Sequence, residues 1–485
     1  MKHRLTAARI PPIFLARAVS LGLALSAFAL QHVSGAEVPP VTGMRHLLLD
    51  SRIVEKAAGV RLVLGTVRKN PANPLFKEDR PWEVRFDNLY PNVTLDIRDG
   101  IFRCWYSPFI VDAVVRETPP EQRGTVRYKP REREMGICHA ASRDGIHWEK
   151  PELGLVEFEG SKDNNLVLKG PHGGGVFFDS ADSDAARRYK MICRSSDTDV
   201  TLGVAFSPDG LHWSEIQRCP EIKAVGDAHN NAFWMPEAGK YVGITRLKTQ
   251  TGERLVARTE STDFIHWTQA EEVLRGDPLN QTYAMPVFRH AGLYLGLLMI
   301  FTPEDDRVHC ELAWSPDTRE WHRVNPGSSL IPNSEKRGDY DWGCVYAGAI
   351  PIVQSDEIRL YYGASNGPHT SWRDGFLALA TLRPDGFAGY EPVDKEISGK
   401  VLTRALRLGG GALRISADAA GGKVTVRLLD EAGKVLATAS PLTGNVTDQP
   451  LRWERGFKYA GVRDRPVRIE FELAAARLYS FSFGP

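Results

Sequence analysis

The sequence has almost no excess of charge of either sign. Its 485 residues include 61 Lys and Arg against 60 Asp and Glu, which gives a net charge of +1. A chain without a basic surplus lacks the attraction that draws proteins to nucleic acids and anionic membrane surfaces. After residue 36, no stretch approaches the roughly 20 apolar residues that span a bilayer. We therefore expect neither a nucleic acid nor a membrane as a partner.

Cysteine is scarce and irregularly spaced. The six residues are Cys104, Cys138, Cys193, Cys219, Cys310 and Cys344. They form no CxxC or other metal-ligand spacing, and most lie in apolar, strand-like runs such as Phe102–Tyr106. We expect buried free thiols rather than a disulfide framework, although export would permit a bond.

Helical periodicity is also missing between Arg45 and Tyr390, where no convincing amphipathic stretch occurs. The chain instead contains 44 Gly, 31 Pro, 11 Trp, 14 Tyr and 20 Phe. This composition is typical of many short strands and tight turns, so the sequence predicts an all-β fold.

The first 36 residues differ from the rest. Basic residues, including Lys2 and Arg17, precede an uncharged run over Ala18–Leu30, and Ser34–Ala36 supplies small residues. This order predicts a secretory signal peptide that is cleaved after Ala36. We expect a mature protein that is secreted or periplasmic.

A short phrase recurs along the chain: Ser, any residue, Asp, usually Gly, two further residues and Trp. Its complete copies begin at Ser142, Ser207, Ser261 and Ser315. A fifth copy, Arg383–Phe387, keeps the Asp-Gly and an aromatic residue but lacks the Trp. Repetition at intervals of 54 to 68 residues indicates a repeat architecture. Because Asp bonds its own turn and Gly accepts a positive φ, each copy predicts a hairpin, and we interpret its Asp and Trp as architectural.

A second hairpin precedes each copy and joins an apolar strand to a strand that carries Tyr. These segments are Asn88–Ser107, Gly175–Arg194, Asn230–Arg246, Tyr283–Phe301 and Tyr346–Ser365. Two hairpins give four antiparallel strands, so the five units predict a five-bladed β-propeller.

The segments that flank the repeats have their own patterns. We expect an outer strand from residues 45–82 to close the last blade. From about Lys400, alternating strands interrupted by Gly contain no copy of the motif, which predicts a β-sandwich that stabilises the fold or binds carbohydrate. The predicted domains are a signal peptide over 1–36, a propeller over 37–395 and a β-sandwich over 400–485.

The loops that lead into the innermost strands of a propeller converge on one face, where a pocket is expected. In this chain they carry acidic, amide, His and aromatic residues: Asp87, Asn88, His172, Asp227, His229, Asn230, Tyr283, Asp341 and Trp342. Rings can stack on the C–H faces of a sugar while polar groups bond its hydroxyls. We predict that Asn88, His172, Asn230, Tyr283 and Trp342 bind the substrate.

Hydrolysis of a glycosidic bond needs two acid/base groups, about 5–5.5 Å apart for retention and about 6.5–9.5 Å apart for inversion. Asp87 is the first choice for nucleophile or general base. Asp227, His229 and Asp341 are the candidates for its partner. A His acid would need a neighbouring carboxylate to place its pKa near working pH, and Asp227 could provide it for His229.

The five units, the run Asp87–Asn92 and the appended strands resemble the five-bladed glycoside hydrolases of families 32, 43, 68 and 117, with family 32 closest. The resemblance implies that Asp87 is the nucleophile or base. The second-blade Asp of these families has no clear match, because the strand entry carries His172 and Asp179 comes late. The third-blade Glu is replaced by Asp227 and His229, and the family 32 signatures Trp-x-Asn-Asp-Pro, Arg-Asp-Pro and Glu-Cys are absent.

The sequence thus predicts an exported glycoside hydrolase that acts on a plant, algal or microbial glycan. An alternative is a non-catalytic carbohydrate-binding propeller. The third hypothesis is a sialidase-like hydrolase, since the repeat is similar to the Asp-boxes of sialidases. Its candidate residues are Arg85, Arg103, Arg246, Arg337 and Tyr283.

The expected partner is an oligo- or polysaccharide substrate, and the expected state is a monomer. No cofactor or metal is predicted, because the chain has no contiguous EF-hand loop. The resemblance leaves a structural calcium ion as an alternative. The acidic run Asp179–Asp184 fits an exposed hairpin turn better than a calcium loop.

Overall fold

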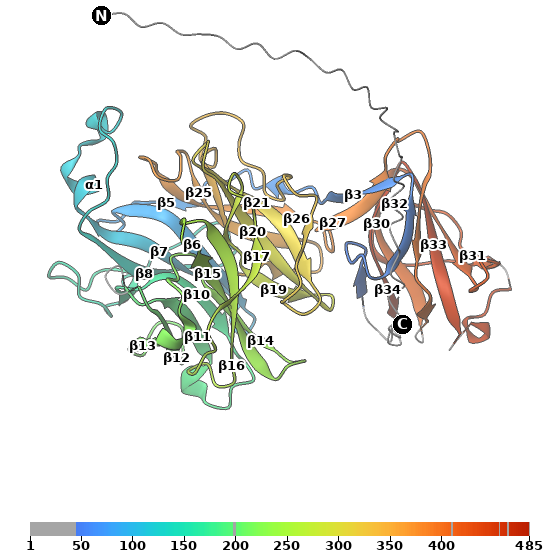
Figure 1. Cartoon of the computed structure of the whole chain (residues 1–485), viewed down its shortest axis with the longest axis horizontal. Helices are drawn as coiled ribbons and strands as arrows, with labels where there is room; N and C mark the ends of the chain where they lie inside the picture. Colours follow the sequence, from blue (N-terminus) through green and yellow to red (C-terminus); the bar gives the residue numbers. More distant parts are fainter. Residues whose placement is uncertain (1–44, 197–199, 409–410, 455, 463–464, 485) are drawn as a thin grey trace, which may run out of the picture. The chain divides into compact units, whose positions relative to one another are not determined.

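The computed structural model describes residues 45–196, 200–408, 411–454, 456–462 and 465–484. The predicted signal peptide lies outside these residues. The regular secondary structure of the described residues is mostly β-strand, with one short α-helix, as Figure 1 shows. No helix in the described part is long and apolar enough to cross a membrane.

Three separate four-stranded antiparallel sheets are consistent with propeller blades. The first consists of β6 (Arg85–Asp96), β7 (Ile101–Asp112), β8 (Arg133–Ser142) and β9 (Leu166–Lys169). The second consists of β10 (His172–Phe178), β11 (Tyr189–Arg194), β12 (Leu202–Ser207) and β13 (Gln217–Arg218). The third consists of β14 (Asn231–Met235), β15 (Lys240–Lys248), β16 (Arg254–Ser261) and β17 (Glu271–Arg275).

Two further groups of strands are joined into one larger sheet by a parallel contact between Val308 and Cys344. One group consists of β18 (Gln281–Ala284), β19 (Val287–His290), β20 (Leu293–Thr302), β21 (Arg307–Ser315) and β22 (His322–Val324). The other consists of β23 (Cys344–Ala347), β24 (Ile352–Val353), β25 (Ile358–Ser365) and β26 (Gly375–Leu382). Strand β6 contacts β10 on one side and β23, β25 and β26 on the other, so the first blade lies beside both the second and the fifth.

The recurring Asp-turn-Trp motif is architectural, as the sequence predicts. In the second copy, the Ser207 hydroxyl accepts hydrogen bonds from the backbone of Asp209 and Gly210. The Asp209 carboxylate accepts two more from the turn that follows. The Trp residues of the third and fourth copies are buried in apolar clusters that their blades share with the preceding blade. The Ser hydroxyl of each of the other three complete copies also accepts a hydrogen bond from the turn backbone. Each complete copy therefore fixes the turn in which it lies.

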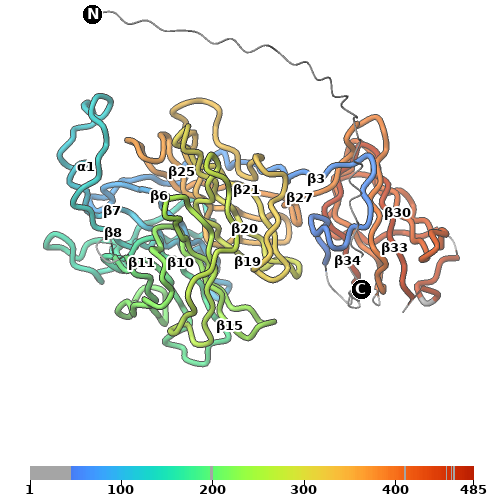
Figure 2. The backbone as a smooth tube through the Cα atoms, viewed as in Figure 1, coloured from blue at the N-terminus to red at the C-terminus, as the bar shows by residue number. Residues whose placement is uncertain are grey.

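The segment before the first blade is divided between two sheets. Strands β4 (Arg68–Lys69) and β5 (Phe76–Lys77) pair with β26 and complete the last blade. Strands β1 (Arg45–Leu47), β2 (Val54–Ala58) and β3 (Val60–Leu64) instead pair with strands of the C-terminal part. The predicted propeller range of 37–395 includes β1–β3, but these strands pair with the C-terminal sheet. Val54 and Val60 pack against the C-terminal core, whereas Leu47, Leu62 and Leu64 pack against the core of the fourth and fifth groups of strands. Figure 2 shows this early part of the trace beside β34.

The C-terminal strands form one connected sheet in the order β2-β28-β33-β30-β34-β27-β3. Its C-terminal strands are β27 (Ala388–Pro392), β28 (Gly399–Thr403), β29 (Leu406–Arg407), β30 (Ala412–Leu429), β31 (Val435–Thr438), β32 (Leu442–Pro450), β33 (Pro466–Ala474) and β34 (Arg477–Gly484). Alternate residues of β33 are buried, and they pack in a core of their own with β30 and β34. This sheet occupies the predicted sandwich region, and its division into two packed layers stays a prediction.

Helix α1 (Ala113–Glu117) begins a long connection between β7 and β8. Figure 1 shows this connection extending beyond the strands that it joins. It is fixed to the last blade, because the indole of Trp372 donates a hydrogen bond to the carbonyl of Val126 and its ring packs on Tyr128. The connection is therefore placed to form a wall above the inner strands.

Candidate functional site

A cavity of about 490 Å³ lies where the entries to the inner strands meet. Its walls come from all five blades and from the connection after α1: Asp87, Phe109, Arg127, Tyr128, Lys129, Pro130, Arg133, His172, Asp227, Arg246, Arg254, Tyr283, His369 and Thr370. Four of the predicted site residues, Asp87, His172, Asp227 and Tyr283, are therefore brought together. They are distant in sequence and meet only because their strands share the centre of the fold.

Asp87 lies near the start of β6, with its side chain 18% exposed. Arg373 donates hydrogen bonds from Nη2 to its carbonyl at 2.6 Å and its Oδ1 at 2.9 Å. Arg85 Nε is 3.6 Å from the same Oδ1. Burial alone would raise the pKa of Asp87, but Arg373 and Arg85 outweigh it and lower the pKa to about 2. The carboxylate is therefore ionised at any ordinary pH.

A buried hydrogen-bond network supports Asp87 from below. Asn88 accepts from Arg373 Nη2 at 3.0 Å and donates to the hydroxyls of Tyr90 at 2.6 Å and Tyr283 at 3.0 Å. Asn88 is 3% exposed. It therefore positions Arg373 and Tyr283 beneath the cavity, and the predicted contact between Asn88 and a substrate is not what the structure shows.

Asp227 is the second carboxylate of the cavity and is surrounded by cations. Its oxygens lie 2.7 Å from Arg246 Nη2, 3.7 Å from Lys248 Nζ and 3.8 Å from Arg194 Nη1. His172 Nε2 is 3.5 Å from Oδ1. Burial would raise the pKa of Asp227, but Arg246 and the other partners lower it well below its usual range.

Glycines after His172 let the second blade approach the Asp227 loop closely. A Cβ at Gly173 would lie 1.9 Å from the carbonyl oxygen of Ala228, and one at Gly175 would lie 1.9 Å from that of Asn230. Gly173 also has a φ of +58°, which favours glycine. These residues therefore set His172 beside Asp227.

His229 is not a wall residue of the cavity, contrary to the prediction. It is 1% exposed, and its ring nitrogens lie 3.2 Å from the Ala347 carbonyl and 3.4 Å from Asn92 Oδ1. Its ring centroid is 5.1 Å from that of Tyr90. Burial lowers the pKa of His229 to about 4. The imidazole that Asp227 contacts is that of His172, because the bent loop turns His229 inward.

Asp341 and Trp342 also lie away from the cavity. Asp341 is fully buried and forms an ion pair with Lys69 on the closing strand β4, at 2.6 Å, while accepting from the Tyr362 hydroxyl. The Trp342 ring contacts the guanidinium groups of Arg307 and Arg337. Asp341 therefore pairs with a residue of the N-terminal strand β4 that completes the last blade, and it does not line the cavity as the sequence predicts.

Asn230, another predicted substrate contact, is fully buried. Its Nδ2 donates to the carbonyls of Gly173, Gly226 and Ala228, and its Oδ1 accepts from Thr245. It holds the shape of the loop that carries Asp227 and does not reach the cavity.

Several wall residues are missed by the sequence analysis. The Nδ1 atom of His369 is hydrogen-bonded to the Tyr346 hydroxyl at 2.8 Å. Burial and the nearby Arg373 lower the pKa of His369 well below its usual range. Arg254 begins β16, and Arg133 begins β8. Basic residues that alternate at the end of a strand, such as Arg246 and Lys248, are the sequence signal that could have indicated a basic cavity wall.

The arginines of the sialidase hypothesis do not gather. Arg103 pairs with Asp99 at the turn between β6 and β7, and Arg337 stacks on Trp342 outside the cavity. Only Arg246 of that set lines the cavity, with Arg85 behind Asp87.

Within the described residues, no group of three or more His, Cys, Asp and Glu side chains could hold a metal ion. In the acidic run after β10, Lys190 forms ion pairs with both Asp179 and Asp182. The hairpin interpretation of that run fits these contacts.

No protein-family model and no curated protein match the chain. Among solved structures, a glycosyl hydrolase from Bacteroides ovatus has 16% identity and a TM-score of 0.45, over 68% of this chain and 98% of its own. A structure of the GH130 family of mannoside phosphorylases, which contains glycoside hydrolases that target β-1,2-mannosidic linkages in Candida mannan, has 16% identity and a TM-score of 0.44, over 66% and 95%.

A further similar structure is an N-acetylgalactosamine deacetylase from F. plautii in complex with blood group B trisaccharide. It has 14% identity and a TM-score of 0.44, over 67% of this chain and 96% of its own. At such identities, residue roles do not transfer between chains, and the chemistry of the site follows from its own side chains.

Proposed function

We propose that this chain is a glycosidase whose active site is the cavity between Asp87 and Asp227. One observation carries the proposal: two ionised carboxylates, a His paired with one of them and the aromatic ring of Tyr283 line a single cavity. Carboxylates that face a shared space are the usual machinery of glycosidic bond cleavage. The substrate is an oligo- or polysaccharide.

In this proposal Asp87 is the nucleophile or general base, because its pKa of about 2 keeps it unprotonated. Asp227 is also ionised, so neither carboxyl group is the acid. His172 takes that role, with the Asp227 carboxylate orienting its imidazole at 3.5 Å. The acid/base partner that the sequence analysis sought in His229 is thus assigned to His172.

The cellular setting is part of the same proposal. Residues 1–36 direct export, and the mature chain acts outside the cytoplasm as a monomer, with a C-terminal β-sandwich as in family 32 enzymes. A polysaccharide substrate is found in that compartment.

A second candidate function is a non-catalytic carbohydrate-binding propeller. It is favoured by the ion pairs of Asp87 and Asp227, because no carboxyl group that lines the cavity has the raised pKa of a typical general acid. In that case the same side chains would only bond sugar hydroxyls.

The two functions are separated by Asp87→Asn. We expect the variant to lose turnover of a hydrolysed glycan by about 10²–10⁴-fold while still retaining that glycan in affinity electrophoresis. His172→Gln should reduce turnover similarly, and Asp163→Asn, at an exposed position, is the matched control. Retention without hydrolysis by the unmutated protein across a broad glycan panel would establish the binder instead.

A further inference from the structure

The cavity carries more positive charge than its two carboxylates can balance. Five guanidinium or ammonium groups lie within 4 Å of those two side chains: Arg85 and Arg373 at Asp87, and Arg194, Arg246 and Lys248 at Asp227. The whole chain has a net charge of only +1. The excess is therefore a local property of the site and not of the protein surface in general.

Arg254 adds a positive charge that has no carboxylate partner among the described residues. Its guanidinium lies 4.4 Å from the ring centroid of Phe301 and 5.5 Å from that of Tyr283. Its one side-chain hydrogen bond within the described structure goes from Nη1 to the neutral amide of Gln281, at 3.0 Å. Burial and the nearby Arg246 lower its pKa, but an Arg of this kind stays charged. Its remaining donors are available at the cavity wall.

A second part of the cavity wall is also basic. The connection after α1 brings Arg127 and Lys129 to the cavity, and both residues are exposed. Arg133 lies 4.4 Å above the ring of Phe109 at the same wall. A neutral sugar in the cavity would not compensate the charges of Arg254, Arg127 and Lys129, whereas an anionic group would form charge-assisted hydrogen bonds with them.

We propose that the glycan bound in this cavity is acidic and that Arg254, together with Lys129 and Arg127, binds its oxyanion, a carboxylate or a sulfate. The inference rests on the proposed function, for which it names the substrate class. Asp87 and Asp227 then contact the uncharged part of the sugar, since an oxyanion beside either carboxylate would be repelled. Arg254 is a binding residue in this assignment and has no part in proton transfer.

The test compares matched ligands by isothermal titration calorimetry. The probes are an oligogalacturonide against the same oligomer after carboxyl reduction, and a sulfated oligosaccharide against its desulfated form. We expect at least one acidic member to bind about tenfold or more tightly than its neutral counterpart. The preference for the acidic ligand should decrease as NaCl rises from about 0.05 to 0.5 M, because salt screens the attraction between the basic side chains and the anionic ligand.

Arg254→Gln should reduce that preference by about tenfold, because affinity for the acidic ligand falls more than affinity for its neutral counterpart. The double variant Arg127→Gln/Lys129→Gln changes only exposed positions, so it tests the same charge if the Arg254 variant folds poorly. Arg275→Gln, on the outer strand β17, is the matched control.

Equal binding of both members in both pairs would overturn the inference while leaving the Asp87 result intact. Binding of an acidic glycan that depends on Arg254, without turnover, would support the acidic ligand and contradict the glycosidase. Cleavage of a neutral glycan that requires inorganic phosphate would show that the oxyanion is a separate reactant, and the glycan would then not need to carry it.

Discussion

Glu78 joins the first and last blades through a single side chain. Its carboxylate accepts from the backbone N–H of Phe86 at 2.8 Å and of Gly375 at 2.9 Å. Burial raises its pKa from 4.5 to about 7, although these two hydrogen bonds act in the opposite direction. The protonated group therefore stabilises the fold fully below pH 4.5, and this contribution is lost as the pH rises through 7.

We predict that Glu78→Gln flattens the pH dependence of stability, because the amide oxygen still accepts both hydrogen bonds but does not ionise. The gain over the unmutated protein should grow between pH 5 and pH 8, as measured by urea unfolding at several pH values. Glu121→Gln, at an exposed position, is the control. Parallel pH profiles of the two proteins would contradict the assignment.

The individual site residues were only partly predictable. Asp87, His172, Asp227 and Tyr283 stand at the entries of inner strands, so the repeat located them. His229 stands at a similar place but points inward. The direction of each side chain in this loop depends on a bend stabilised by Asn230, and no local pattern encodes it.

At the level of elements, Asn73 continues the closing edge between β4 and β5. Its side-chain oxygen accepts from Leu379 N–H at 2.9 Å, and its Nδ2 donates to the Leu379 carbonyl at 2.9 Å. The Asn73 side-chain amide thus pairs with β26 as the backbone of a neighbouring strand would. Through Tyr340 it also contacts the residues around Asp341.

We predict that Asn73→Ala lowers the free energy of unfolding by about 1–3 kcal/mol, because the Leu379 N–H is left buried without an acceptor. Urea unfolding followed by Trp fluorescence measures the change. Asn70→Ala is the matched control, since that side chain only accepts from the exposed Ala72 N–H. A similar loss in both variants would rule out the proposed role of Asn73.

The positions of the strands were easier to predict than the strands with which they pair. The repeat identified the strands of all five units because Asp-Gly turns and apolar runs are local signals. The three N-terminal strands β1–β3 are short and have no turn motif that distinguishes a blade edge from another sheet. Their pairing with β34, β28 and β27 follows from long-range contacts that a sequence pattern does not record.

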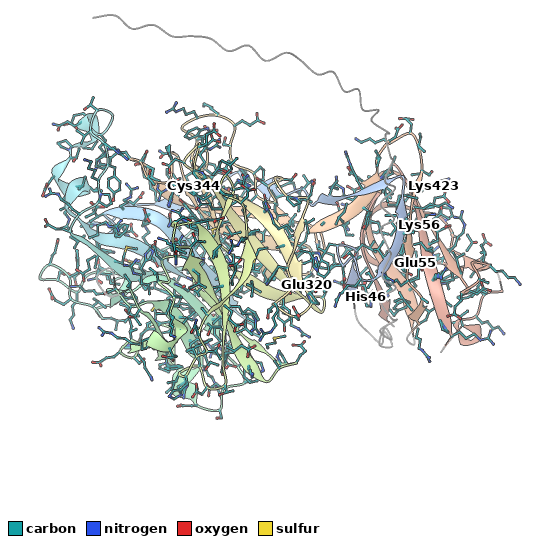
Figure 3. The ribbon with its side chains drawn as sticks, viewed as in Figure 1. His46, Glu55, Lys56, Glu320, Cys344 and Lys423 are labelled. Atoms are coloured by element: carbon teal, nitrogen blue, oxygen red, sulfur yellow. The ribbon has the colours of Figure 1, made fainter. Side chains whose placement is uncertain are left out.

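Across the whole molecule, all six cysteines are free and buried. Figure 3 shows one of them, Cys344, within the propeller strands. Burial raises the pKa of Cys193 and Cys219 to about 12 and that of Cys104 and Cys310 further. These four thiols therefore stay protonated, and all six are shielded from solvent.

We predict that the native protein reacts very slowly with an aromatic disulfide reagent at pH 8 and that six thiols react at once in denaturant without reductant, because only the thiolate attacks. The absorbance of the released thiolate gives the number. Four or fewer reactive groups in denaturant would reveal a disulfide.

The division of the N-terminal strands also sets an order of events during synthesis. Arg45 pairs with Ser482, and Lys69 pairs with Ala380, so the earliest strands find partners only after nearly the entire chain has emerged. Until then β1–β5 present open edges, which other chains can join. The strands that are synthesised first are thus among the last to pair. Correct folding therefore requires that β1–β5 remain unpaired while the blades between them and their partners form.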